Sequence, residues 1–196
     1  MTRQAEASKR TKTKIMEVAR ELFIAKGYSE TTLKDILMAG DISKGNLYHH
    51  FKGKEFLFLH IVEEDYKQWI DKWKERKNPS RNAVENLYDY AMFSVQESFN
   101  HYPILQATEE FLASAFKSKE VIEKLNEMDK QYLEIIEEIL IEGNHDKSWN
   151  IQDIDSSTQI VSSLFFGLEA MVQNKSYEEK EKIYQEAVRV LIKGLQ

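Results

Sequence analysis

Apolar residues recur at helical spacing along almost the whole chain. The first run places five apolar side chains on one face, Ile15, Val18, Ala19, Leu22 and Phe23. Gly27 follows this run and is typical of a helix C-cap. We find no run of alternating apolar and polar residues bounded by turns, which would indicate strands. The pattern therefore predicts an all-α protein.

Nine helices account for this pattern. Thr32 with Asp35 has the spacing of a capping box, and so does Ser176 with Glu179. Breaks are expected at residues 39–41, 51–53 and 78–80, where Gly, Asp or Pro interrupts the apolar periodicity. The expected helices lie near residues 15–26, 32–36, 44–50, 54–76, 81–100, 103–115, 118–143, 155–173 and 177–195.

Composition excludes several classes of protein. The 196 residues contain no Cys, which excludes a disulfide scaffold, a thiolate metal site and cysteine catalysis. The polar start shows no signal peptide, and no apolar run reaches the roughly 18–20 residues of a membrane span. We therefore expect a cytoplasmic protein without a membrane partner.

Charge is distributed unevenly along the chain. Residues 1–54 contain 11 Lys and Arg against 6 Asp and Glu, whereas the whole chain has 27 against 33 and a net charge of -6. A basic amino-terminal region on an acidic protein indicates a surface that binds a polyanion. A solvated basic face is the common alternative.

Residues 31–51 have the pattern of two short helices joined by a break that contains Gly40. This is the geometry of a helix-turn-helix, whose second helix enters the major groove of DNA. An ordinary corner between two helices is the alternative. We predict contacts with DNA bases or phosphates from Thr32, Ser43, Lys44, Gly45, Asn46, Tyr48, His49, Lys52 and Lys54.

These residues carry a family resemblance. The residues that match are Gly27-Tyr28, Thr31-Thr32, Ile36, Gly40, Ile42-Ser43-Lys44-Gly45-Asn46-Leu47-Tyr48, His50-Phe51, Lys54-Glu55 and Leu57. In identity and spacing they resemble the amino-terminal domain of the TetR family of repressors. Leu37 and Asp41 depart from the family pattern without removing a DNA contact. The resemblance implies a homodimer that binds palindromic, double-stranded operator DNA and releases it when a small-molecule inducer binds. We assign DNA reading to residues 1–53 and ligand binding and dimerisation to residues 54–196.

The carboxy-terminal two-thirds is similar to multidrug-binding members of the family, in Trp69, Trp73, Tyr102-Pro103, Glu142-Gly143-Asn144 and Trp149. This similarity implies a pocket in which aromatic rings and the carboxylates of Asp65 and Asp129 hold a lipophilic cation. Tyr66 and Phe99 stand where such members have further pocket acids. The alternatives are rings that only form the core, carboxylates that are exposed or paired internally, and a neutral or acidic ligand. The predicted ligand contacts are Asp65, Tyr66, Trp69, Phe99, Tyr102, Phe111, Asp129, Tyr132 and Phe166.

The last two expected helices carry apolar stripes at coiled-coil-like spacing. The family resemblance favours their use as a dimer interface, although such a stripe is equally suited to the subunit's own core. The predicted interface residues are Val161, Leu164, Phe165, Leu168, Val172, Tyr184, Val188 and Leu191.

Catalytic chemistry is weakly supported by the sequence. His49 and His50 point about 100° apart on a helix, and the other histidines lack partners at ligand spacing. No Gly-rich phosphate loop or nucleophile elbow is present. We therefore expect no enzyme, no metal and no cofactor. A helical adaptor that binds another protein through its last two helices is the alternative of a different class.

Overall fold

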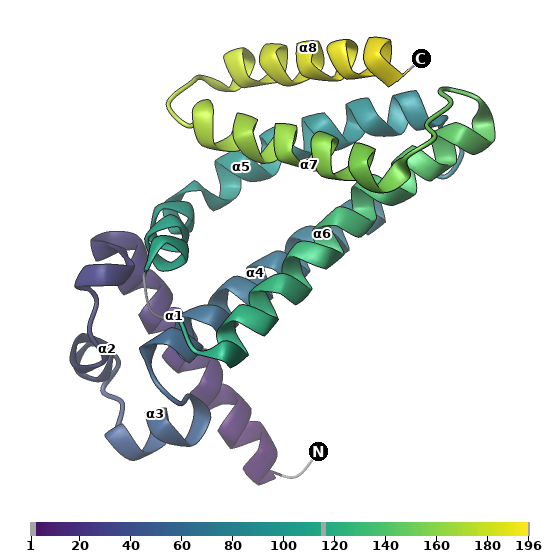
Figure 1. Cartoon of the computed structure of the whole chain (residues 1–196). Helices are drawn as coiled ribbons and strands as arrows, with labels where there is room; N and C mark the ends of the chain where they lie inside the picture. The colour runs from purple at the N-terminus through teal and green to yellow at the C-terminus, as the bar shows by residue number, and fades with distance from the viewer. Residues whose placement is uncertain (1–2, 115–116, 196) are drawn as a thin grey trace. The chain divides into compact units, whose positions relative to one another are not determined.

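The computed structural model describes residues 3–114 and 117–195, apart from the side chains of residues 99–103. In that part of the chain every regular element is helical (Figure 1). The elements are α1 (Arg3–Glu30), α2 (Leu33–Gly40), α3 (Lys44–His50), α4 (Lys54–Arg76), α5 (Ala83–Ala113), α6 (Lys119–Asp146), α7 (Ile154–Met171) and α8 (Tyr177–Leu195). The predicted all-α class is confirmed.

Two helix boundaries explain how the expected helices map onto these elements. Gly27 interrupts α1 with φ 80 and ψ 171, a backbone conformation open mainly to glycine, so the regular first helix ends where the sequence predicts. By contrast, residues 83–113 form one continuous helix, although the sequence predicts two helices separated before Pro103. The expected fifth and sixth helices are therefore joined in α5.

The chain forms two compact units. Unit 1 comprises residues 1–67 and 101–125, and unit 2 comprises residues 68–100 and 126–196. Helices α4, α5 and α6 each contribute to both units, because the boundaries of the units fall inside them. The functional division at residue 53 remains a prediction. The compact unit that contains α1–α3 extends further, through the start of α4 and the segment 101–125.

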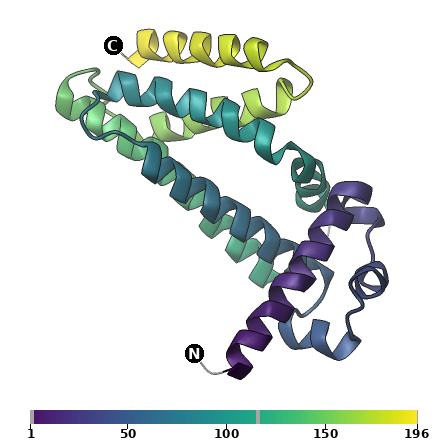
Figure 2. The ribbon, with the colours of Figure 1, turned by 180° about the vertical axis from the view of Figure 1, so that it is seen from behind.

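Unit 1 is held together by aromatic packing between segments that are distant in sequence. The ring of Phe23 meets that of Phe58 at 4.8 Å, edge to face, and Tyr28 meets Phe111 at 5.0 Å. Phe23, Phe58 and Phe111 are fully buried. Rings of this size bury much apolar area and add a specific geometry to it. The short helices α2 and α3 lie next to α1 in this unit, as both ribbon views show (Figures 1 and 2).

Unit 2 has its own core. Trp73, Tyr90, Phe165 and Tyr184 are almost fully buried in it, and α7 and α8 lie side by side as an antiparallel pair in both ribbon views (Figures 1 and 2). At the end of α6, a Cβ on Gly143 would lie 1.9 Å from the Trp149 ring, so a residue without a side chain is required there.

Candidate functional site

Local side-chain caps fix the two helices of the predicted helix-turn-helix. The Thr32 hydroxyl oxygen accepts a hydrogen bond from the Asp35 N–H, and the Asp35 carboxylate accepts one from the Thr32 N–H, which completes the predicted capping box of α2. Asp41 ends α2 in the left-handed region at φ 48, which aspartate tolerates well. The Ser43 hydroxyl then caps α3 by accepting from the Asn46 N–H at 3.2 Å.

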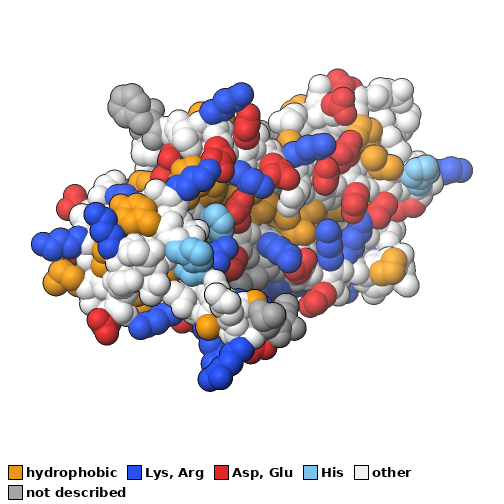
Figure 3. Space-filling view, turned by 90° about the horizontal axis from the view of Figure 1, so that it is seen from below, with side chains coloured by type: hydrophobic (Ala, Val, Ile, Leu, Met, Phe, Trp, Pro, Cys, Tyr) orange, Lys and Arg blue, Asp and Glu red, His pale blue; other side chains and the backbone are white. Residues whose placement is uncertain are grey.

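Helix α3 has one buried anchor and an exposed polar surface. Leu47 is fully buried, which fixes the rotation of α3 against unit 1. A Cβ on Gly45 would meet no atom within 4 Å, so the backbone is open to close approach there. On the face of the molecule seen from below, Lys and Arg side chains lie among histidine, acidic and hydrophobic side chains (Figure 3). The predicted DNA-contact residues on or next to α3 that are exposed are Ser43, Lys44, Gly45, Asn46, Tyr48 and His49.

Lys54, a predicted phosphate contact, has internal partners. Its ammonium donates hydrogen bonds to the carbonyl oxygens of Tyr28 at 2.9 Å and Ser29 at 3.4 Å, and it lies 4.3 Å from the centre of the Tyr28 ring. Burial lowers the pKa of Lys54. The side chain therefore holds the end of α1 in place instead of projecting outward. The sequence could not show this partner, which lies 26 residues away.

Two other predicted phosphate contacts already have partners. The Thr32 hydroxyl donates to the Asp35 carboxylate at 2.7 Å as part of the helix cap. Lys52 is exposed but forms an ion pair of 2.5 Å with Glu120, at the start of α6. Both side chains reach the surface, so a DNA phosphate would have to compete with these carboxylates.

Asp65 does not act as a free pocket acid. Both of its carboxylate oxygens accept hydrogen bonds from Arg20, at 2.6 and 2.7 Å, and its side chain is 16% exposed. Phe111 is buried against Tyr28 in the aromatic core of unit 1. Internal partners engage both side chains, which favours the alternatives of an internally paired carboxylate and a core ring. Ligand contact by Asp65 and Phe111 stays a prediction. Tyr66, another predicted contact in unit 1, is partly buried.

Unit 2 brings three predicted pocket rings together. Tyr132 lies 5.6 Å from Trp69 and 4.5 Å from Phe166, measured between ring centres. Burial raises the pKa of Tyr132 to about 12. Trp69 is partly exposed and Phe166 is 52% exposed, so the cluster reaches the surface of unit 2. The side chains of Phe99 and Tyr102 lie outside the described residues.

Asp129 lies one helical turn before Tyr132 on α6. It is exposed and forms no hydrogen bond or ion pair with the described residues, yet contact with protein atoms removes enough water to raise its pKa. It is therefore the predicted pocket carboxylate that stays available to a cation.

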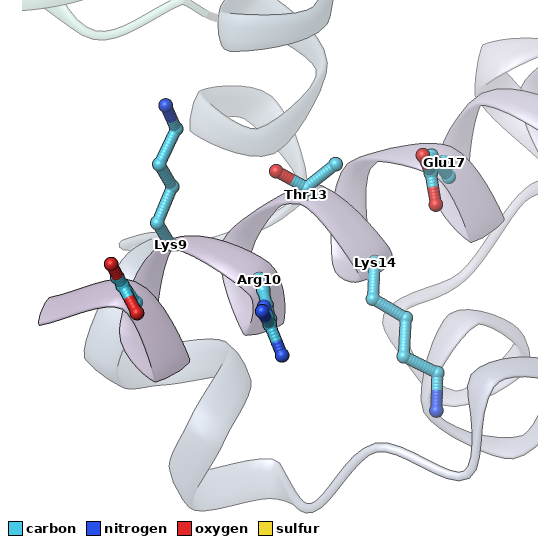
Figure 4. A pocket seen from close by; sticks show the side chains of 6 residues that line it. Lys9, Arg10, Thr13, Lys14 and Glu17 are labelled. Atoms are coloured by element: carbon cyan, nitrogen blue, oxygen red, sulfur yellow. The ribbon is translucent and has the colours of Figure 1, made fainter. Parts of the chain in front are cut away.

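A shallow hollow runs along one side of α1. Figure 4 shows its side chains, with Lys9 on one side of the helix and Arg10 and Lys14 on the other. The residues that line it are Glu6, Lys9, Arg10, Thr13, Lys14 and Glu17. None of them was among the predicted site residues.

Two kinds of feature are absent from the described part of the chain. No group of three or more His, Asp or Glu side chains there is placed to hold a metal ion. Nor is any helix in that part long and apolar enough to cross a membrane.

The apolar stripes of α7 and α8 mostly face the core of unit 2. Phe165, for example, packs 5.1 Å from the buried Tyr90 ring and is itself 2% exposed. For the buried members of the predicted interface, this burial favours the alternative of a core-facing stripe, and the interface itself stays a prediction. The buried members are Val161, Phe165, Val172, Tyr184 and Val188, whereas Leu164, Leu168 and Leu191 are partly exposed.

A buried polar network in unit 2 was missed at the sequence level. The Lys180 ammonium is 2% exposed and donates to the Ser98 hydroxyl at 3.0 Å. That hydroxyl donates to Glu169 at 2.6 Å, and the Tyr184 hydroxyl donates to the same carboxylate at 3.1 Å. The sequence contains one indication of this network: Lys180 stands four residues before Tyr184, so a charged residue lies on the apolar stripe of α8. The network joins α5, α7 and α8.

Comparisons with known proteins agree with this geometry. The family model described as "Bacterial regulatory proteins, tetR family" matches residues 15–61, which include α2 and α3. The model described as "QacR-like protein, C-terminal region" matches residues 65–196. Together they account for most of the chain.

Individual relatives extend along nearly the full length. The transcriptional regulator QacR of Staphylococcus aureus is 32% identical over 184 residues, which is 94% of this chain and 97% of QacR. The regulator UidR of Escherichia coli is 24% identical, with 94% of this chain and 92% of UidR covered. These relatives are transcriptional regulators and not enzymes.

Solved structures share the fold. A transcriptional regulator FadR from Bacillus subtilis, solved with stearoyl-CoA, has a TM-score of 0.79 at 21% identity and covers 94% of this chain and 99% of its own. GusR of Salmonella enterica has a TM-score of 0.75 at 22% identity, with 95% of each chain covered. Capped helices α2 and α3, two matching family models and a full-length relative lead to one conclusion: this chain belongs to the TetR family of bacterial transcriptional regulators and has a QacR-like carboxy-terminal region.

Proposed function

We propose that this protein is a homodimeric repressor whose α3 helices read a palindromic operator and which a lipophilic ligand releases from DNA. The observation that carries the proposal is the two-sided character of α3. Leu47 is buried, while Lys44, Asn46 and Tyr48 are exposed on a short helix with a well-formed cap. Such a helix can enter a major groove as a rigid body.

The exposed residues of α3 divide between phosphate contacts and base contacts. Asn46 and His49 carry the donors and acceptors needed to read base edges. Lys44 and Tyr48 suit phosphates, and the Lys44 ammonium lies 5.8 Å from the Tyr48 ring, so the two side chains approach the same region. The open surface above Gly45 lets the backbone come close to the duplex.

The dimer interface is assigned to the outer faces of α7 and α8. Because several predicted interface residues are buried in the subunit, the available apolar surface must come from other positions. Ile160, Met171 and Val190 are 63%, 82% and 57% exposed. Large apolar side chains exposed on adjacent helices are typical of a surface that another protein covers. A second copy is the partner that the family assignment supports.

The ligand region is assigned to the ring cluster of Trp69, Tyr132 and Phe166 in unit 2, with Asp129 as the acid. Aromatic faces next to a carboxylate suit a lipophilic cation, and each such contact contributes about 0.5–2 kcal/mol. Because Asp65 is paired with Arg20, Asp129 is the one carboxylate of the two expected that has no internal partner among the described residues. This favours a singly charged cation, and it keeps a neutral apolar ligand as the second candidate.

The test of the ligand class is a titration of cationic dyes and neutral analogues of similar size, with Trp fluorescence as the readout. Asp129→Asn should weaken the cation and spare the neutral analogue, while the exposed Glu127→Gln on the same helix is the control. A bound ligand should also lower the affinity for DNA, and the coupling free energy between the two sites is typically about 1–3 kcal/mol. If Asp129→Asn binds the cation as wild type does, the second candidate replaces the first.

A further inference from the structure

Most cations of the helix-turn-helix region are engaged within the protein. Residues 15–54 contain six Lys and Arg and five Asp and Glu, so this stretch is almost neutral. Four of the six cations have internal partners: Arg20 with Asp65, Lys26 with Asp35, Lys52 with Glu120, and Lys54 with the Tyr28 carbonyl. Lys34 and Lys44 form no ion pair with described residues. DNA affinity depends largely on neutralised phosphates, so positive charge is needed from elsewhere.

The first turns of α1 supply such charge. The tetR family model begins at residue 15, whereas α1 begins at Arg3, about three helical turns earlier. Residues 3–14 contain five Lys and Arg and one Glu. The four cations that are exposed and form no ion pair with described residues are Arg3, Lys9, Arg10 and Lys14.

The residues 3–14 that carry these cations lie next to α3 in unit 1. The ammonium of Lys12 lies 5.7 Å from the ring of Phe51, the residue that caps the end of α3. Both ribbon views show the amino-terminal end of α1 and α3 at the same end of unit 1 (Figures 1 and 2). Residues 3–14 extend over about 17 Å, which is about five phosphate spacings along one strand.

These turns are not required by the core. Ile15 is the first buried apolar residue in the described part of the chain, and the side chains that line the hollow on α1 are exposed (Figure 4). A helical extension that buries little and repeats Lys and Arg is well suited to a flexible, sequence-independent contact with a polyanion.

We propose that residues 3–14 of α1 are a second DNA-contact element, which binds the phosphate backbone beside the half-site that α3 reads. The inference rests on the proposed function and deepens it, since it assigns affinity mainly to α1 and sequence reading to α3. Lys and Arg side chains in this element bind phosphates of any sequence. Removing them therefore lowers affinity for specific and random DNA alike.

The test compares two quadruple variants, each with four substitutions. R3Q/K9Q/R10Q/K14Q removes the exposed cations of the extension, and K74Q/K130Q/K147Q/K175Q removes four exposed lysines of unit 2 as a control for net charge. The DNA probes are a duplex that the wild-type protein selects from a random library and a random duplex of equal length. Fluorescence anisotropy over a range of salt concentrations gives the affinity and its salt slope, and circular dichroism confirms the helical fold.

We expect the extension variant to lose affinity for both duplexes, on the order of tenfold at low salt, while the ratio between them is kept. Loss of one phosphate contact in each half of a dimer should reduce the salt slope by about 1.8. The control variant should match wild type. Ethylation interference should show the missing phosphates at the flanks of the site.

Equal slopes for the extension variant and wild type would overturn the inference. It would also be overturned if the extension proved to bind vesicles of phosphatidylglycerol and phosphatidylcholine while the DNA slope stayed unchanged. Failure of the proposed function can be distinguished from failure of this inference. If the wild-type protein selects no sequence from the library, the proposed function fails before any variant is compared.

Discussion

The guanidinium of Arg20 donates two hydrogen bonds of 2.6 and 2.7 Å to the carboxylate of Asp65, and this pair joins the middle of α1 to α4 within unit 1. A paired, parallel set of bonds between a guanidinium and a carboxylate is stronger and more directional than a single ion pair. The pair is partly buried, with side-chain exposures of 31% and 16%. The pair therefore holds α1 against α4 within unit 1.

The first prediction follows from this pair. Asp65→Asn should lower the free energy of unfolding by about 1–2 kcal/mol, because it leaves the Arg20 charge without its partner in a half-buried site. Urea unfolding monitored by circular dichroism measures the loss. Asp71→Asn, at an exposed position on the same helix, is the matched control and should change little. An Asp65→Asn protein as stable as the control would contradict the structural role.

The second prediction concerns the end of α1. A Cβ on Gly27 would lie 2.5 Å from a carboxylate oxygen of Glu110, the same carboxylate that accepts a hydrogen bond from the Ser29 N–H at 2.9 Å. Gly27→Ala should cost about 1–3 kcal/mol for the backbone conformation alone, and the displaced Glu110 adds to this.

Gly53→Ala is the control for this prediction, since a Cβ there meets no atom within 4 Å. Thermal unfolding separates the two variants. Adding Glu110→Ala to Gly27→Ala should relieve the collision and leave the backbone cost. Equal midpoints for the two single variants would show that neither the conformation nor the close approach matters.

The third prediction concerns assembly. Ile160→Asp changes an exposed residue of α7 and should give a folded monomer, whereas Phe165→Asp places a charge in the core and should unfold the protein at a cost of several kcal/mol. Analytical ultracentrifugation with circular dichroism distinguishes these outcomes. Gln159→Asp, exposed on the neighbouring face of α7, should remain dimeric. A dimeric Ile160→Asp protein would move the interface elsewhere.

The fourth prediction concerns alkaline pH. Burial raises the pKa of Tyr132 to about 12 from a usual value of 10.0, so the folded state disfavours the phenolate. The contribution of the neutral phenol to stability is complete below pH 10.0 and is lost as the pH rises toward about 12, because the unfolded chain ionises first. Tyr132→Phe should remove this part of the alkaline loss.

Urea unfolding at several pH values across that window measures the slope. If stability falls as steeply in Tyr132→Phe as in wild type, the ring is more hydrated than the structure indicates.

The sequence predicts local features of this fold well. The caps at Thr32 and Ser43 and the break at Gly27 depend on neighbouring residues and on backbone conformations that few residue types adopt, so they can be recognised without the fold. The all-α class follows from periodicity for the same reason. The polar surface of α3 follows once Leu47 is recognised as its apolar anchor.

Contacts between distant segments could not be predicted in this way. The partners of Lys54 and Asp65 lie on α1, 26 and 45 residues away, and no local pattern marks them. The apolar stripe of α7 shows a different limit, because the same spacing serves a core and a dimer interface. Phe165 and Ile160 differ in burial although both are large apolar residues on one helix.

The most direct test of the central claim is the affinity of α3 variants for the DNA that the wild-type protein selects from a random library. Lys44→Ala and Tyr48→Phe change exposed side chains and should leave the fold intact. Measured by fluorescence anisotropy, each should bind the selected duplex more weakly than wild type, and Lys44→Ala should reduce the salt slope by about 0.9 for each phosphate contact that it loses. If both variants bind the selected duplex with wild-type affinity and salt dependence, α3 is not the element that reads DNA.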